Sequence, residues 1–447
     1  MNRKKRAPRS AFFYLTFARA CDRIKLYKPS GDTPEKEVFF MRAYERLLNY
    51  VKIHTASADD AETVPSTERQ FDLARPLCDE LRSLGIEAEV DEHCYVRGWL
   101  PATPGYEGAP CVAFIAHVDT VPDFSGEGVK PRVIENYDGG DLPLGKSGRT
   151  LSVKAFPHLP KLAGRTLIVT DGTTLLGADD KAGVAEAMTL LEELIERKIP
   201  HGKVAVCFTP DEEVGRGTAF FDIPRLGADF GYTIDGGFEG EVVFENFNAA
   251  AAVVSVAGFN VHPGEATGIM KNAALIAAEF AAALPADETP ATTGGRKGFY
   301  HLTDLSGNVE TATLRYILRD HDAKKLEEKK RTVEKLVATF NEKYGDGTVG
   351  VEIRDQYRNM KEKIDETPFV VDLALEATKE CGIAPISEPI RGGTDGANLT
   401  WQGLPCPNLG TGGFGFHGPY EHITVEGMDA VVKILHAIVR KAAKLKK

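Results

Sequence analysis

T-P-D-E-E-V-G at residues 209–215 is the stretch around which we expect the fold to be organised. An apolar run at residues 204–208 precedes it and is typical of a buried strand. Glu212 and Glu213 then follow the end of a strand, where open α/β sheets place their chemistry. Adjacent carboxylates in a loop point in different directions, so one can bind a metal ion while the other handles a proton. An isolated Glu-Glu pair is more often a solvated acidic turn, and only the other motifs of the chain favour the chemical interpretation.

Length and composition indicate a globular protein of two domains. The chain has 447 residues, 43% of them hydrophobic and 27% charged, and this length exceeds what one hydrophobic core usually holds. The formal net charge of -11 argues against a nucleic-acid partner, because phosphate binding requires a basic excess. No window approaches the roughly 20 apolar residues of a membrane span, so we expect no membrane contact.

The seven cysteines are widely spaced, and no two of them form a C-x-x-C pair. Their odd number and their spacing fit neither a disulfide framework nor a thiolate zinc site. This usage favours the reducing environment of the cytoplasm.

Residues 1–40 differ in texture from the rest of the chain. A basic N-R-K-K-R at 2–6 precedes a short apolar run at 11–17, but Arg19 lies inside the cleavage site that a signal peptide would need. We therefore expect a dispensable or disordered extension, or a start codon placed too early, with Met41 as the functional beginning.

From Met41 onward, helical and strand patterns alternate as in a layered α/β domain with a mixed sheet flanked by helices. We expect this domain to comprise residues 41–246 and 359–447. The part between them, 247–358, has the order β-α-β-β-α-β of a ferredoxin-like α+β unit. Its expected strands are 250–257, 299–305, 311–319 and 349–353, and its expected helices are 272–284 and a long one through 326–340.

Two further local expectations concern the first domain. Residues 121–164 are rich in Gly and Pro without clear periodicity, which predicts an irregular excursion over the surface near the site. Asp171-Gly172 lies between the apolar stretches 166–170 and 173–176, which predicts a β-hairpin.

Other acidic residues and histidines also follow predicted strands or open a predicted helix. H-V-D-T at 117–120 follows a buried strand, and strand alternation places His117 and Asp119 on the same side. G-A-D-D-K-A-G at 177–183 opens a helix, where one aspartate could simply be a cap, although two in a row are poorly explained that way. Asp235 ends a short strand, and F-H-G at 416–418 closes a Gly-rich run.

Five candidate metal ligands emerge from these motifs: His117, Asp179, Glu213, Asp235 and His417. Two imidazoles and three carboxylates, without a thiolate, suit two borderline divalent ions such as Zn²⁺, with Co²⁺ or Mn²⁺ as alternatives. One shared carboxylate would hold the ions roughly 3.5–4 Å apart, where together they can polarise a carbonyl and acidify a bridging water.

Taken together, the motifs resemble the dinuclear-zinc exopeptidases, and most closely their peptidase T family of tripeptide aminopeptidases. The resemblance runs in order from about Met41 to the C-terminus, with no motif missing. The motifs that carry it are H-V-D-T, G-A-D-D-K-A-G, T-P-D-E-E-V-G, Y-T-I-D-G-G at 232–237, N-V-H-P-G at 260–264, R-G-G-T-D-G at 391–396 and the late His-Gly.

The resemblance implies a role for each candidate ligand. Asp179 would bridge both metals, and its peptide bond to Asp180 would be cis. His117 and Asp235 would bind one ion. Glu213 and His417 would bind the other.

The resemblance also implies the residues that act beside the metals. Asp119 would fix the orientation of His117, and Glu212 would be the general base. His262, Arg319 and Arg391 would grip the substrate, and guanidinium groups suit a peptide carboxylate. For each arginine alone, a structural salt bridge remains the alternative.

These implications predict a cytoplasmic enzyme that removes the N-terminal residue from short peptides, mainly tripeptides. We expect a homodimer formed through the inserted lid, 247–358, with His262 reaching the partner's site. A related metallo-carboxypeptidase or N-acyl-amino-acid deacylase is the enzymatic alternative. An inactive metal-binding protein that serves as a peptide-binding module or scaffold is the alternative of another class. Loss of the base or of a metal ligand would indicate it, but Glu212 and all five candidate ligands are present.

Overall fold

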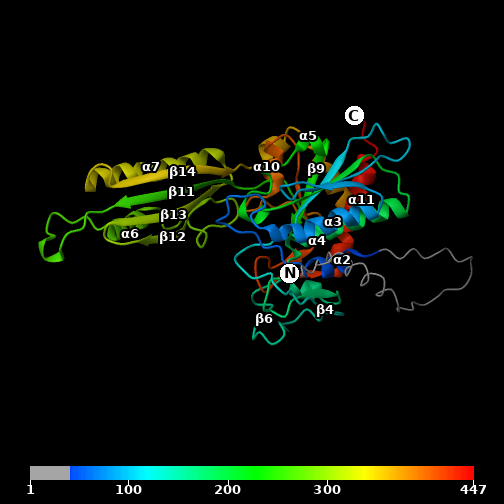
Figure 1. Ribbon diagram of the computed structural model, residues 1–447, viewed down its shortest axis with the longest axis horizontal. Helices are drawn as coiled ribbons and strands as arrows, with labels where there is room; N and C mark the ends of the chain where they lie inside the picture. Colours follow the sequence, from blue (N-terminus) through cyan, green and yellow to red (C-terminus); the bar gives the residue numbers. More distant parts are fainter. Residues whose placement is uncertain (1–40, 447) are drawn as a thin grey trace, which may run out of the picture. The chain divides into compact units, whose positions relative to one another are not determined.

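The computed structural model describes residues 41–446 (Figure 1). The expected extension at residues 1–40 lies outside the described residues. Within residues 41–446 the largest sheet has seven strands in the order β1-β2-β8-β3-β9-β15-β10. These strands are β1 (Glu87–Val90), β2 (Val96–Leu100), β3 (Val112–His117), β8 (Val204–Thr209), β9 (Phe230–Gly236), β10 (Val242–Val243) and β15 (Asn408–Gly410).

The sheet is mixed, as predicted. β3 pairs in parallel with β8 and β9, whereas β2 pairs antiparallel with β8. Every residue of β3 and β8 is buried, which is typical of central strands whose two faces are both covered.

Helices cover both faces of this sheet. A large core on one face includes residues of α2 (Ala43–Tyr50), α3 (Phe71–Ser83), α4 (Ala178–Glu196), α9 (Phe369–Glu380) and α11 (Val425–Ala442). A smaller core on the other face includes residues of α5 (Ile223–Leu226) and α10 (Asp395–Trp401).

Helix α4 lies unusually close to β9. A Cβ atom at Gly183 would lie 2.0 Å from the carbonyl oxygen of Ile234, so only glycine permits this approach. The close packing brings the first turn of α4, with Asp179, next to the end of β9, with Asp235.

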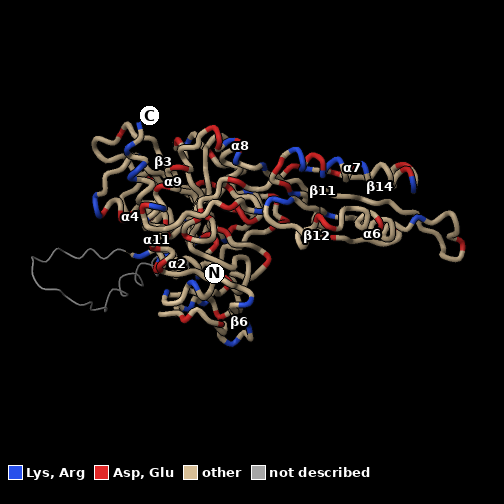
Figure 2. The backbone as a smooth tube through the Cα atoms, turned by 180° about the vertical axis from the view of Figure 1, so that it is seen from behind, with Lys and Arg blue, Asp and Glu red and all other residues tan. Residues whose placement is uncertain are grey.

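A second sheet has four antiparallel strands in the order β12-β13-β11-β14 (Figure 1). In β13, alternate residues are buried against the helices, as half-buried strands require. The elements follow the chain as β11 (Asn248–Ala257), α6 (Ala273–Ala283), β12 (Phe299–Gly307), β13 (Thr311–Asp320), α7 (Ala323–Tyr344) and β14 (Val349–Tyr357), which is the expected β-α-β-β-α-β order. Figure 2 shows Lys and Arg interspersed with Asp and Glu along α7, as on a solvated helix face.

The expectation of an irregular excursion at 121–164 is wrong in part. This segment contributes β4 (Arg132–Ile134), β5 (Leu142–Pro143) and β6 (Thr150–Leu151), and it has a hydrophobic cluster of its own. β4 belongs to a third sheet of order β16-β17-β7-β4, with β16 (Gly413–Phe414), β17 (His422–Thr424) and β7 (Leu167–Val169).

The predicted hairpin around Asp171-Gly172 is also wrong. β7 is a strand, but it pairs with β4 and β17, and residues 173–176 form no strand. The N–H of Leu175 donates to the carbonyl of Ser125, and the N–H of Leu176 donates to the Glu421 carboxylate. These N–H groups therefore bond to residues distant in sequence and not to a second strand of a hairpin.

The remaining described elements are short. They are η2 (Glu68–Gln70), η3 (Leu159–Leu162), η4 (Glu212–Val214), η5 (Pro263–Glu265) and α8 (Lys361–Ile364). Among the described helices, none combines the length and the apolar character that crossing a bilayer requires.

Candidate metal centre and active site

Parallel strands bring the first two candidate ligands to one edge of the large sheet. His117 ends β3 and Asp235 lies near the end of the neighbouring β9. The Nε2 atom of His117 lies 3.5 Å from an oxygen of Asp235 and 3.0 Å from Oδ1 of Asp179. The three residues therefore form one group of donors.

Asp179 connects this group to a second one. Its Oδ2 atom lies 3.1 Å from Nε2 of His417, and that nitrogen lies 3.1 Å from Oε2 of Glu213. The two oxygens of Asp179 thus face two different imidazoles. This is the arrangement that a bridging carboxylate needs, and the Asp179–Asp180 peptide bond is cis, as predicted.

Glu212 lies beside the first group. One donor atom from each of His117, Glu212 and Asp235 lies within 4.8 Å of the other two, and the same holds for His117, Asp179 and Glu213. Glu212 and Glu213 both belong to the short helix η4, which directly follows β8. The structure therefore brings both glutamates of T-P-D-E-E-V-G and all five candidate ligands together.

Asp119 supports both sides of the centre. Its fully buried carboxylate accepts the backbone N–H groups of Glu212 at 3.1 Å and of Glu213 at 3.3 Å. The same carboxylate lies 3.3 Å from Nδ1 of His117. The carboxylate thus fixes the loop of the two glutamates, and together with the backbone carbonyl of Asp119, which lies 3.1 Å from Nδ1 of His117, it orients the ring of a candidate ligand.

Two carboxylates to which the sequence analysis gave no role hold the first turn of α4. Glu421 accepts the N–H groups of Leu176 and Gly177 at 2.7 Å and of Asp179 at 2.9 Å. Asp180 accepts the N–H groups of His117 and Gly183, both at 3.1 Å, and so ties α4 to β3. Glu421 follows His417 without any periodic pattern, and only its proximity to the late His-Gly motif could have drawn attention to it.

Asp211 is a third such residue. It has a left-handed backbone with φ 55°, and its carboxylate accepts the N–H of Ser66 and the amide group of Gln70, each at 2.6 Å. Because a non-glycine residue with positive φ is uncommon, these contacts explain how the turn before Glu212 is held. The signal in the sequence was the aspartate of T-P-D-E-E itself.

Burial and neighbouring charges shift the pKa values of the acidic residues and of His417 in the centre. Burial raises the pKa of Glu213 to about 7, with Asp179 adding to the effect, and burial also raises the pKa of Asp235 to about 7. Burial and Asp235 raise the pKa of Glu212 well above its ordinary value. Hydrogen bonds to Asp179 and Glu213 raise the pKa of His417 to about 11.

For Asp179, burial raises the pKa, but hydrogen bonds from His117 and His417 outweigh it and bring the pKa below its ordinary value. Crowded carboxylates of this kind favour bound cations. The nitrogen and oxygen donors are those that borderline divalent ions accept. The residues present therefore fit a metal centre.

The three predicted substrate-binding residues lie apart from these ligands. No hydrogen bond or ion pair within residues 41–446 joins any of them to the five. His262 is exposed before η5, and its Nδ1 accepts the N–H of Gly264 at 3.2 Å. Arg319, on β13, donates to Oε1 of Gln356 at 2.9 Å.

Arg391 has structural partners. Its Nη1 atom donates to the carbonyl oxygens of Gly295 at 2.8 Å and Lys297 at 3.1 Å. Its guanidinium also lies 5.1 Å from the ring of Phe247 and 5.3 Å from that of Phe299. In this structure the guanidinium fastens the loop that precedes β12.

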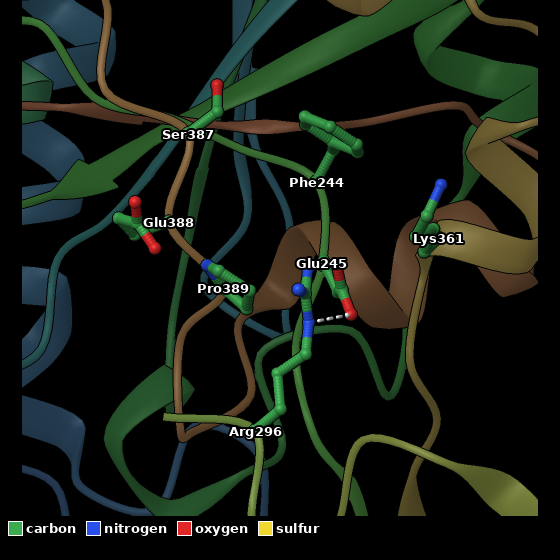
Figure 3. Close-up of a pocket in the computed structure, with 7 residues that line it drawn as sticks. All are labelled: Phe244, Glu245, Arg296, Lys361, Ser387, Glu388 and Pro389. Carbon is green, nitrogen blue, oxygen red and sulfur yellow. Dashed lines mark hydrogen bonds and ion pairs between the residues drawn. The ribbon is translucent and has the colours of Figure 1, made fainter. Parts of the chain in front are cut away.

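A separate cavity lies where that loop approaches residues 244–245 (Figure 3). The guanidinium of Arg296 reaches across it to Glu245, with Nε 3.0 Å from Oε1. Its lining contains none of the candidate ligands and not Glu212: it consists of Phe244, Glu245, Arg296, Lys361, Ser387, Glu388 and Pro389. This cavity is therefore no part of the metal centre.

Comparisons with known proteins agree with this geometry. Residues 170–441 match the model of peptidase family M20/M25/M40. A peptidase T from Caldanaerobacter subterraneus subsp. tengcongensis is 50% identical over 401 residues, which are 89% of this chain and 98% of that protein.

Two solved structures share the fold. The aminopeptidase PepT from Bacillus cereus ATCC 10987 superposes with a TM-score of 0.71 at 25% identity, covering 90% of this chain and 98% of the other. A tripeptidase from Staphylococcus aureus subsp. aureus mu50 superposes with a TM-score of 0.73 at 22% identity and the same coverage. The family match over more than half of the chain and the identity over nearly all of the relative lead to one conclusion: the chain belongs to peptidase family M20/M25/M40 and, within it, to the peptidase T group.

Proposed function

We propose that this protein is a metal-dependent aminopeptidase that hydrolyses the N-terminal residue from short peptides, with tripeptides as its main substrates. The observation that carries the proposal is the carboxylate of Asp179, whose two oxygens face His117 and His417, with Glu212 beside the first group. Membership of a peptidase family supports hydrolysis of a peptide bond. The aminopeptidase from B. cereus and the tripeptidase from S. aureus support action at the N-terminus of tripeptides.

The five candidate ligands would hold two divalent ions, Zn²⁺ in our proposal, with Co²⁺ or Mn²⁺ as alternatives. His117 and Asp235 would serve one ion, Glu213 and His417 the other, and Asp179 both. The chemistry that such ions would supply is polarisation of the scissile carbonyl and a lower pKa of a water molecule.

Glu212 is the general base in this proposal. Its carboxylate takes a proton from the attacking water and returns it to the leaving amine. Asp119 orients this step, because its carboxylate receives the N–H groups of both Glu212 and Glu213. Arg319 and Arg391 would bind the substrate carboxylate, and Arg391 would do so with the N–H groups that its bonds to two carbonyl oxygens and to Thr293 do not use.

We also propose the domain division 41–246 and 359–447 for the catalytic domain and 247–358 for an inserted lid that forms a homodimer. Exposed apolar side chains in the loop that contains His262 and in the helix that follows it support a second copy of the chain as the partner: Phe259 is 54% exposed, Ile269 52% and Leu275 68%. Large exposed apolar side chains on one loop and the following helix mark interaction surfaces. In this proposal the two copies are related by two-fold symmetry and His262 acts at the partner's centre.

A cytoplasmic location is the last part of the proposal. The thiols of Cys94 and Cys207 are buried, and burial raises the pKa of Cys207 to about 12. Such thiols behave as small apolar core residues and suit a reducing compartment.

A panel of peptides tests the proposal. The purified enzyme is incubated with di-, tri- and tetrapeptides and with N-acetylated and C-amidated tripeptides, and the products are identified by mass. We expect release of the N-terminal residue from free tripeptides and none from the acetylated form. Release of the C-terminal residue would indicate a carboxypeptidase, removal of the acetyl group a deacylase, and tight binding without cleavage an inactive peptide-binding protein.

A further inference from the structure

Tyr357 lies at a break in the register of the second sheet. Ala250 of β11 pairs with Asp355 of β14, but the preceding residue, Ala249, pairs with Tyr357 rather than Gln356. β14 therefore carries one extra residue there, which is a β-bulge. Bulges redirect side chains and occur often beside active sites.

The redirected residues hold Arg319. The guanidinium of Arg319 lies over the ring of Tyr357, 4.7 Å from its centroid, and donates to the side chain of Gln356 at 2.9 Å. A cation over an aromatic face is attracted to it, and the amide oxygen fixes its direction. Gln356 and Tyr357 thus set the position of an arginine that we propose to bind the substrate carboxylate.

Contacts from Tyr357 also lead to the loop of Glu212. A Cβ atom at Gly393 would lie 2.6 Å from the ring of Tyr357, so the ring packs directly on the R-G-G-T-D-G backbone. Asp395 of the same motif accepts the hydroxyl of Thr209 at 2.8 Å, at the end of β8 just before Glu212. The ring therefore adjoins the segment that supports the base.

The charge environment of the phenol agrees with this placement. Burial raises the pKa of Tyr357 to about 12, while Arg319 lowers it and Glu212 raises it. The hydroxyl therefore stays protonated near neutral pH. A neutral phenol is a hydrogen-bond donor.

We propose that Tyr357 is a substrate-positioning residue whose hydroxyl donates to the carbonyl oxygen of the second peptide bond of a tripeptide. This inference rests on the proposed function. Glu212 acts at the first peptide bond and Arg319 holds the C-terminal carboxylate, so the second peptide bond crosses the space between them. A dipeptide has no second peptide bond, so this contact favours tripeptides over dipeptides.

The test compares two substrates and two enzymes. One substrate is a tripeptide and the other is its analogue in which an (E)-alkene replaces the second peptide bond, which removes both the carbonyl oxygen and the N–H and keeps the planar shape. The variant Tyr357→Phe removes only the hydroxyl and keeps the ring under Arg319 and against Gly393. We expect kcat/KM for the tripeptide to fall about 3- to 10-fold, the range for one hydrogen bond, and kcat/KM for the alkene to stay unchanged.

Tyr316→Phe is the matched control. Tyr316 lies in the same sheet, and its buried hydroxyl has no hydrogen-bond partner within the described part of the chain, so its removal should leave both substrates unaffected. An equal loss on both substrates in Tyr357→Phe, or no loss on either, would overturn the inference. Wild-type enzyme that cleaves tripeptides but treats the alkene equally well would overturn it too, whereas failure of wild type to cleave any tripeptide refutes the proposed function itself.

Discussion

Replacement of Glu212 by glutamine tests the central step of the proposed mechanism. Glutamine keeps the length and most of the shape of the side chain but cannot take a proton from water. The backbone N–H of residue 212 still donates to Asp119, as it does at 3.1 Å in the wild-type protein. The loop should therefore keep its conformation while the base is lost.

The expected loss is large. General acid–base help contributes about 10²- to 10⁴-fold, so turnover should fall by that factor, which is about 2.7–5.4 kcal/mol in the activation barrier. Substrate affinity should stay near the wild-type value, because the proposed substrate-binding residues are untouched. Metal content should also stay near normal, because the five candidate ligands remain.

Glu213→Gln is the matched comparison at the neighbouring position. The carboxylate of Glu213 lies 3.1 Å from His417, and an amide is a poorer ligand than a carboxylate. This variant should therefore lose bound metal, measured by elemental analysis of the dialysed protein, with activity restored in part by added metal. Near-normal turnover of Glu212→Gln, or loss of metal from it rather than from Glu213→Gln, would refute the division of roles between the two glutamates.

Three further predictions concern the surroundings of the centre. Asp119→Asn should weaken metal binding about 10- to 100-fold, because the amide cannot accept both N–H groups of the loop and also face His117. Competition with a chelator measures the affinity, and an unchanged affinity would contradict this prediction. Removal of metal with a chelator should abolish activity and lower the melting temperature, because ligands that bind only the folded state stabilise it. Addition of Zn²⁺, Co²⁺ or Mn²⁺ should restore both the activity and the melting temperature. An unchanged melting temperature would count against a resident metal. Mixing His262→Ala with Glu212→Gln chains should restore part of the activity if His262 completes the partner's centre, and no recovery after demonstrated subunit exchange would argue against a shared site.

The sequence was sufficient to predict that the candidate ligands at strand ends lie close together, and the reason is physical. Apolar runs mark the buried strands β3, β8 and β9, and parallel pairing delivers their carboxyl ends to one edge of the sheet. His117, Asp235 and the two glutamates therefore had to lie near each other. The role of each ligand, including the bridging role of Asp179, came instead from the resemblance, because no local pattern predicts the contacts of a bridging carboxylate.

The failures also have a common cause. The hairpin around Asp171-Gly172 was predicted from local turn chemistry, but Glu421 and Ser125 take the N–H groups that a second strand would have used. Glu421 itself is far away in sequence and fixes the start of α4 through three backbone N–H groups. Partners of this kind depend on the completed fold, so local sequence patterns do not show them.

The residues of R-G-G-T-D-G at 391–396 have different contacts. The resemblance assigned its arginine to the substrate, yet the guanidinium of Arg391 donates to two carbonyls of the loop before β12. Gly393 of the same motif packs on the ring of Tyr357. Asp395 accepts a hydrogen bond from the hydroxyl of Thr209. Within the described residues Arg391 already donates three hydrogen bonds, to two carbonyl oxygens and to the hydroxyl of Thr293, whereas Arg319 has one side-chain hydrogen bond and an aromatic face. In the proposed function, Arg319 therefore has more N–H groups available for a substrate carboxylate, because most of those of Arg391 fasten the loop before β12.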